Sequence, residues 1–86
     1  MPPLPDPTPT SLAFGAVLRR CRLAEGLTQA ELAELADVHL NTIGLNERGR
    51  TVPTLDVLIR LAASLGVPAA SMVAEVESEL TGSSET

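Results

Sequence analysis

The side chains that could perform chemistry in this chain are mainly arginines. The sequence holds six arginines, a single cysteine, Cys21, and a single histidine, His39, with no tyrosine or tryptophan. This set cannot assemble a nucleophile, a general base and a group that orients the base, so we do not expect an enzyme. One cysteine cannot form an internal disulfide, and the two residues together cannot complete a structural zinc site. We therefore expect no metal and no cofactor, and, since no second domain follows residue 80, no small-molecule ligand.

Charge is distributed unevenly along the chain. The formal net charge is −5, which argues against a polyanionic partner, because affinity for nucleic acid comes from basic side chains on phosphates. All six arginines, however, lie between residues 12 and 66, where six acidic residues balance them. Most of them fall into two groups, 19–22 and 48–50, which can build one positive patch if the fold brings them together.

Length and composition indicate one small helical domain. The 86 residues can close a single core, and 44% of them are hydrophobic, which is too apolar for a disordered chain. Phe14 is the only aromatic residue, so the core must be aliphatic, and that composition favours helices over strands. The apolar run at 61–74 is shorter than the ~20 residues that span a bilayer, and we find no secretory signal. We expect a soluble, cytoplasmic protein.

Turn signals divide the chain into segments, beginning with an arm and a first helix. Residues 1–10 hold five of the seven prolines and predict a flexible arm. A first helix is expected over 12–25. Thr10 or Ser11 can cap its start, and Gly26 can end it in the left-handed conformation.

The next two helices are short and follow each other closely. Thr28 and Glu31 form a T-x-x-E capping box, in which each side chain binds a free backbone amide, and this predicts a helix over 29–36. After a three-residue connection, residues 40–46 can make two turns of helix with Ile43 pointing inward.

Two further helices complete the domain. Thr54 can cap a helix over 55–65. Pro68 suits the first turn of a last helix, whose apolar spacing continues through an acidic stretch to Leu80. Residues 81–86 are a polar tail.

The helices at 29–36 and 40–46 describe a helix-turn-helix, since a short turn joins them and the second presents small and polar side chains. An α-helix fits the major groove of DNA, where base edges show a unique pattern of donors and acceptors, and a supporting helix lets it insert. The predicted fold class is therefore all-α, a compact five-helix bundle over 11–80.

Six segments in and around this motif stand in a specific order and spacing. They are Leu18-Arg19-x-x-Arg22, Gly26-Leu27-Thr28-Gln29-Ala30-Glu31-Leu32-Ala33, Thr42-Ile43, Glu47-Arg48-Gly49-Arg50, Pro53-Thr54-Leu55 and Leu61-Ala62-x-x-Leu65-Gly66-Val67. With this pattern, residues 12–67 resemble the Cro/repressor-like (XRE-type) transcriptional regulators, which have the lambda repressor-like DNA-binding fold. The segment HLNTIGLNERGR is also similar to controller proteins of restriction-modification systems.

The resemblance implies roles for individual residues. Base edges would be read by outward residues of the third helix, namely Leu40, Asn41, Thr42 and Leu45. Asparagine can pair with adenine, and leucine or the threonine methyl can touch thymine methyls, so we predict an A·T-rich half-site core. DNA phosphates would be contacted by Gln29, Arg48 and Arg50, with His39 and Asn46 as lesser candidates.

The resemblance also implies an ion pair between Arg22 and Glu47 that ties the first helix to the end of the third. The third helix itself looks weak. His39 stands at its start and is a poor N-cap, and Gly44 costs ~1 kcal/mol relative to alanine. Asn46 stands where the family usually has an apolar residue.

Several of these residues also have a plain structural interpretation. Cys21 fits a core thiol better than a redox sensor. His39 can face solvent, and Leu40 and Leu45 can be ordinary surface leucines. The acidic residues at 75–79 form either a solvated helix face or a surface that repels nonspecific DNA.

The sequence thus predicts a sequence-specific transcriptional regulator that binds double-stranded DNA as a homodimer on a palindromic or repeated operator. Dimerisation is expected because one small module makes too few contacts for tight, selective binding. We expect the interface on the last helix, at Met72, Val73, Val76 and Leu80. The alternative is a protein-interaction module, such as an antitoxin or an adaptor, which the acidic charge and the leucines of the third helix would suit.

Overall fold

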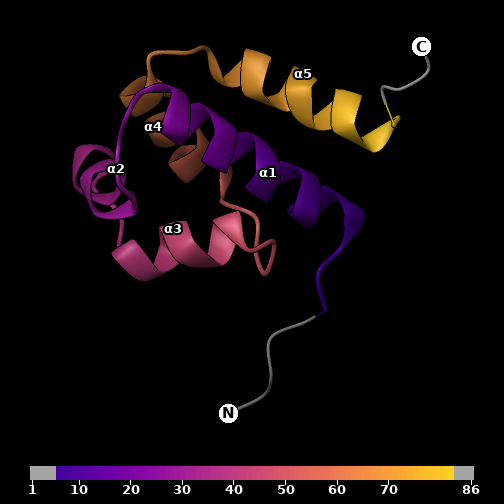
Figure 1. The fold of residues 1–86 in the computed structure, drawn as a ribbon, viewed down its shortest axis with the longest axis horizontal. Coiled ribbons are helices and arrows are strands. Elements are labelled where there is room, and N and C mark those ends of the chain that lie inside the picture. Colours follow the sequence, from indigo (N-terminus) through magenta and orange to yellow (C-terminus); the bar gives the residue numbers. More distant parts are fainter. Residues whose placement is uncertain (1–5, 83–86) are drawn as a thin grey trace.

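The structure, a computed structural model, describes residues 6–82, and these form five α-helices and no strand. The helices are α1 (Pro9–Ala24), α2 (Gln29–Ala36), α3 (Leu40–Glu47), α4 (Leu55–Leu65) and α5 (Ala69–Leu80). Figure 1 shows α1 in the middle of the bundle, with α3 along one side of it and α5 along the other. α2 packs against both α3 and α4. The predicted all-α five-helix architecture is confirmed.

The core is aliphatic apart from one phenylalanine, as the composition predicts. Every helix contributes buried side chains to it. The apolar residues of the core are Ala13, Phe14, Val17, Leu18, Leu32, Ala33, Ala36, Ile43, Leu61, Ala62, Leu65, Met72 and Val76. Because each helix buries only one face, the outer faces of α3 and α4 are left to solvent.

α1 begins earlier than predicted, at Pro9. Its N-cap is Thr8, whose hydroxyl oxygen accepts from the amide of Ser11 at 3.0 Å, while the Ser11 hydroxyl oxygen accepts from the amide of Thr8 at 2.8 Å. Pro9 occupies the first helical position, where no backbone hydrogen bond is lost. The end of the predicted arm is therefore part of the helix start. Residues 1–5 of the arm and 83–86 of the tail lie outside the described residues.

Local signals set the boundaries of α2 and α4 as predicted. The capping box of α2 is present, with the amide of Glu31 donating to Thr28 Oγ1 at 3.0 Å and the amide of Thr28 donating to Glu31 Oε1 at 2.9 Å. Thr54 caps α4 by accepting from the amide of Val57. Gly66 ends α4 in the left-handed conformation, with a φ of +74°. These helices therefore keep the predicted bounds.

The turn between α2 and α3 is held by α4. Asp37 ends α2 with a φ of +58°, the only positive value at a non-glycine residue within 6–82. Arg60 of α4 donates from Nη1 to the carbonyl oxygens of Ala36 and Asp37, at 3.0 and 2.8 Å. A guanidinium group at this end of α2 satisfies carbonyls that the helix leaves free and complements its dipole. The sequence analysis did not foresee this contact.

α5 packs its apolar stripe inward, which corrects the expected dimer interface. Met72 is 1% exposed and Val76 is 8% exposed, and both belong to the core. Val73 and Leu80 remain on the surface. Arg20 of α1 also binds two acids of the predicted cluster on α5, Glu75 and Glu79, at 2.8 and 3.4 Å.

No single helix in the described part of the chain is long and apolar enough to cross a membrane. α4 and α5 meet that length and composition only as a pair, and they are bent by 104° where they join.

Candidate nucleic-acid interface

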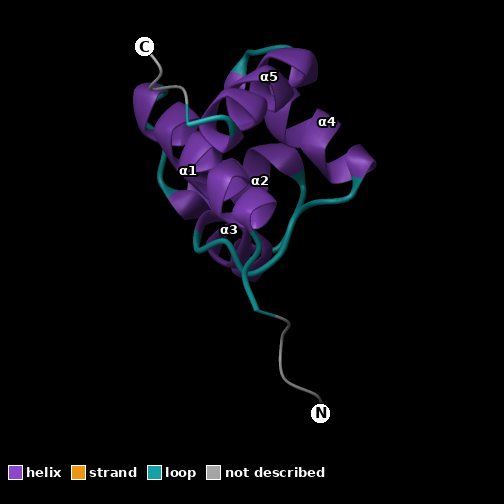
Figure 2. Ribbon diagram, turned by 90° about the vertical axis from the view of Figure 1, so that its right-hand side faces the viewer, coloured by secondary structure: helices purple, strands orange, loops and turns teal. Residues whose placement is uncertain are grey.

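α3 lies at the edge of the molecule with one face uncovered. In both Figure 1 and Figure 2 it is the lowest helix, on the opposite side of α1 from α5. On the inner face of α3, Ile43 is fully buried. On its outer face, Leu40 is 51% exposed and Asn41 is exposed. Thr42 and Leu45, which we expected to face outward, are half-buried. Leu40 and Asn41 are therefore the most exposed of the predicted base-reading residues.

The start of α3 is weakly capped, as predicted. His39 occupies the N-cap position in an extended conformation, and its side chain makes no capping hydrogen bond. Its backbone carbonyl accepts the first helical hydrogen bond, from the amide of Thr42 at 2.9 Å. The imidazole is exposed and lies at the same end of α3 as Leu40.

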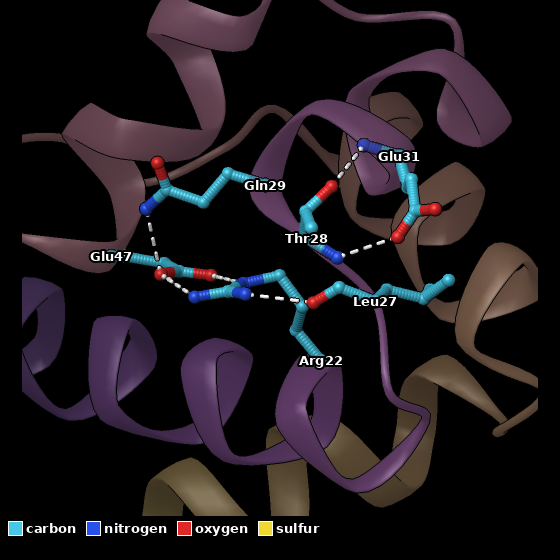
Figure 3. A network of polar contacts seen from close by, with 6 residues as sticks. All are labelled: Arg22, Leu27, Thr28, Gln29, Glu31 and Glu47. Atoms are coloured by element: carbon cyan, nitrogen blue, oxygen red, sulfur yellow. Dashed lines mark hydrogen bonds and ion pairs between the residues drawn. The ribbon is translucent and has the colours of Figure 1, made fainter.

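The end of α3 is fixed to α1 by a buried ion pair (Figure 3). Arg22 Nε lies 2.6 Å from Glu47 Oε2, and Arg22 Nη2 donates to Glu47 Oε1 at 2.9 Å. The side chains are only 9% and 4% exposed. Arg22 Nη1 also donates to the carbonyl of Leu27 at 2.8 Å, and Gln29 Nε2 donates to Glu47 Oε1 at 3.0 Å. The predicted pair is thus the centre of a network that joins α1, α2 and α3.

The network shifts the pKa of both partners in the ion pair. Burial raises the pKa of Glu47, but the hydrogen bonds from Arg22 and Gln29 and the positive charge of Arg22 together lower that pKa below its ordinary value. The hydrogen bond to Glu47 raises the pKa of Arg22 against the opposite effect of burial. Both groups therefore stay charged at neutral pH.

Gln29, a predicted phosphate contact, has a partner inside the protein. It is the first residue of α2 and is half-buried, and its side-chain nitrogen is held by Glu47. This contact fixes the side chain at the N-terminal end of α2, where backbone amides point outward and favour anions.

The arginines divide into structural and free groups. Three of them bind partners within the protein: Arg20, Arg22 and Arg60. Within residues 6–82, the other three form neither an ion pair nor a side-chain hydrogen bond: Arg19, Arg48 and Arg50. Arg19 lies close enough to Glu47 to help lower the pKa of that carboxyl. Two arginines of the first predicted group, Arg19 and Arg22, thus lie near Glu47 at the end of α3, next in the chain to the second group.

Asn46 is not available to DNA, which corrects its expected role. It is 1% exposed, and its Nδ2 donates to the carbonyl oxygen of Thr51 at 3.1 Å and to the Thr51 hydroxyl at 2.8 Å. Its Oδ1 is buried with no hydrogen-bond partner in the described part of the chain. Asn46 therefore orders the loop that follows α3. A polar residue on the buried stripe of α3, three positions after Ile43, is the sequence signal for this.

Cys21 is half-buried against the core, and burial, chiefly, raises the pKa of its thiol. A raised pKa disfavours the reactive thiolate. Among residues 6–82, no three side chains of histidine, cysteine, aspartate or glutamate come together as metal ligands.

Comparison with known proteins points to one family. A sequence model described as a helix-turn-helix domain matches residues 13–75. No curated protein matches the chain significantly. Among solved structures, the clp gene regulator ClgR from Corynebacterium glutamicum is 30% identical, with a TM-score of 0.79 over 92% of this chain and 81% of its own. The restriction-modification controller protein C.AhdI from Aeromonas hydrophila is 32% identical, with a TM-score of 0.70 over 72% of this chain and 94% of its own.

A third similar structure is the hypothetical transcription factor NHTF from Neisseria, at 28% identity and a TM-score of 0.70 over 84% of this chain and 83% of its own. The class defined by the fold and by these relatives is that of helix-turn-helix transcriptional regulators. The chain belongs to the helix-turn-helix domain family, whose model covers more than half of it. The resemblance to XRE-type regulators and to controller proteins is confirmed.

Proposed function

We propose that the chain is a sequence-specific transcriptional regulator of the cytoplasm, which places α3 in the major groove of an operator. The observation that carries this proposal is the free face of α3, on which Leu40 and Asn41 are exposed while the end of the helix is locked to α1 and α2. A helix held at its edge by a supporting helix is the geometry that major-groove recognition needs.

Three groups around α3 suit contacts to the DNA backbone. Arg19 and Arg50 carry positive charge beside α3, and Gln29 lies at the N-terminal end of α2. Such groups can bind phosphates on either side of the groove and fix the position of α3 without contacting the bases. Asn41 and Leu40 would then meet the base edges, which supports an A·T-rich core.

We further propose that two copies bind together through an apolar face on α4 and α5, which replaces the interface expected from the sequence. This apolar face consists of Val52 in the loop before α4, Leu55, Leu58 and Ile59 of α4, and Val73 of α5. Leu55, at 71% exposure, is the most exposed of these residues. A shallow groove of about 200 Å³ is lined by Val52, Leu58 and Val73 among others. A protruding leucine and an apolar groove on the same face suit a two-fold interface, in which each copy offers both.

The test of the DNA function is the binding of the intact chain to duplexes selected from a random pool. We expect selection to yield a repeated or palindromic sequence. Binding to it should weaken steeply with salt, because bound phosphates release counterions. A chain that selects no sequence and shows no salt-dependent binding to mixed DNA is not a regulator of this kind. In that case the acidic charge and the exposed Leu40 would direct the search to a protein partner.

A further inference from the structure

Arg48 follows the last turn of α3 on the exposed side of that helix. Its backbone keeps a right-handed helical conformation, with a φ of −82° and a ψ of 0°, so it continues the geometry of the helix. Leu40, Gly44 and Arg48 are spaced four residues apart and therefore lie in one row along α3. This row begins with Leu40, which is 51% exposed.

The Arg48 side chain folds back over Gly44. A Cβ atom built on Gly44 would lie 3.0 Å from Arg48 Nη1, 3.7 Å from Cζ and 3.8 Å from Nη2. Gly44 is buried although it stands in the outward row, which is consistent with this cover. The missing side chain at residue 44 thus leaves a notch in the outer face of α3, and the Arg48 guanidinium occupies it.

The guanidinium in this notch is free to bind something outside the protein. Arg48 is exposed and makes no ion pair or side-chain hydrogen bond with any described residue. Its N–H donors therefore lie about one helical turn before its own Cα. This position is between the first turn of α3, which carries Leu40 and Asn41, and the end of the helix. A guanidinium that only reached for a flanking phosphate would have no reason to lie along the face that enters the groove.

We propose that Arg48 reads a base, and that it donates to O6 and N7 of a guanine from the notch at Gly44. This inference rests on the proposed DNA function and changes the role that the sequence suggested for Arg48, which was a phosphate contact. The planar guanidinium matches the two acceptors that guanine shows in the major groove. Each half-site then contains a required G·C pair next to its A·T-rich core.

The experiment compares operators selected from a random duplex pool by the wild-type chain and by three variants. Arg48→Ala removes the guanidinium, Gly44→Gln fills the notch with a polar residue of good helix propensity, and Arg50→Ala removes a neighbouring arginine as the matched control. Helix content and thermal melting are measured for each, so that a loss of binding is compared only among folded chains.

Arg48→Ala and Gly44→Gln should both lose the preference for guanine at one position in each half-site. Their affinity for the wild-type operator should fall ~10- to 100-fold, while duplexes with that G·C pair replaced are bound as well as the original. Arg50→Ala should select the unchanged sequence with lower affinity for all duplexes.

Two results would overturn this inference and leave the proposed DNA function standing. If Arg48→Ala selects the wild-type sequence and weakens all duplexes equally, Arg48 is a phosphate contact. If Gly44→Gln keeps the guanine preference, the notch does not position Arg48. If the wild-type chain itself selects no sequence, the proposed function has failed, and the role of Arg48 fails with it.

Discussion

The backbone of Gly15 in α1 lies directly against the carbonyl group of Glu47 at the last turn of α3. A Cβ atom on residue 15 would lie 2.6 Å from that carbonyl oxygen, and also 2.6 Å from the carbonyl oxygen of Asn46. Real Cβ atoms do not come so close to a backbone oxygen, so only glycine fits. The carboxylate of the same Glu47 binds Arg22 farther along α1. α3 is thus seated on α1 both by backbone fit and by charge.

Gly15→Ala should therefore destabilise the protein by about 1–3 kcal/mol, because the added methyl group must push α3 away from α1. Urea unfolding followed by circular dichroism measures this. Gly44→Ala is the matched control, since its Cβ meets only the flexible end of Arg48 and alanine favours helix, so stability should rise by up to ~1 kcal/mol. Equal stability of wild type and Gly15→Ala would contradict the close contact.

Glu47→Ala should lower the free energy of unfolding by about 3–5 kcal/mol, because it leaves the Arg22 guanidinium buried without its partner. Thermal melting gives the effect directly. Glu34→Ala, at an exposed position on α2, is the control and should change stability by only a few tenths of a kcal/mol. A Glu47→Ala chain that melts with the control would show that the ion pair carries no stability.

The stability that Glu47 contributes should depend on pH in the acidic range. Its folded pKa lies below its ordinary value of about 4.3, so the unfolded chain binds the proton more readily. The contribution is complete above the unfolded pKa and is lost as the pH falls through the lower, folded pKa. The difference in unfolding free energy between wild type and Glu47→Gln should therefore be constant from pH 7 to about 5 and shrink below pH 4. A difference that stays constant down to pH 3 would contradict the lowered pKa.

Arg60→Ala should destabilise the protein by about 1–2 kcal/mol, because the carbonyls of Ala36 and Asp37 lose a charged donor. Arg20→Ala removes two exposed ion pairs to α5 and should cost less, at most about 1 kcal/mol. Chemical denaturation of both variants ranks them. The reverse order would mean that the ion pairs of Arg20 to α5 contribute more stability than the hydrogen bonds of Arg60 to the turn.

Leu55→Glu and Val73→Glu should turn a dimer into a monomer in sedimentation equilibrium, since a charge cannot be buried in an apolar interface without a partner. Both residues are exposed in the single chain, so the melting of the monomer should change little. Leu23→Glu, also at an exposed leucine, is the control and should leave the dimer intact. A wild-type chain that sediments as a monomer at high concentration would remove the proposed interface.

The parts of the fold that follow local rules could be predicted from the sequence. α2 and α4 have the predicted bounds because a capping threonine opens each of them and a left-handed residue follows each end. The predicted start of α1 was wrong. The capping box at Thr8 has serine at its third position instead of glutamate or glutamine, and it lies within a run of prolines. Proline is compatible with the first turn of a helix, so composition alone could not place that boundary.

The parts of the site that depend on long-range packing could not be predicted in the same way. Apolar spacing led us to expect Met72 and Val76 at the dimer interface, because spacing alone does not tell whether this chain or a second one covers them. Asn46 could be recognised as unusual, yet its partner Thr51 lies in a loop without periodicity. Gly44 was identified as a cost to helix stability, and only the structure shows what fills its place.

Arg60 links α4 to the turn that leads into α3. α4 carries most of the face on which a second copy is expected to rest, and the same helix grips the bend that leads into α3. We therefore expect a displacement of α4 to change the angle at which α3 projects. If two copies bind through this face, the position of α4 sets both the distance between the two α3 helices and their tilt. An operator with a single base pair inserted at its centre should then be bound poorly even when both halves are intact.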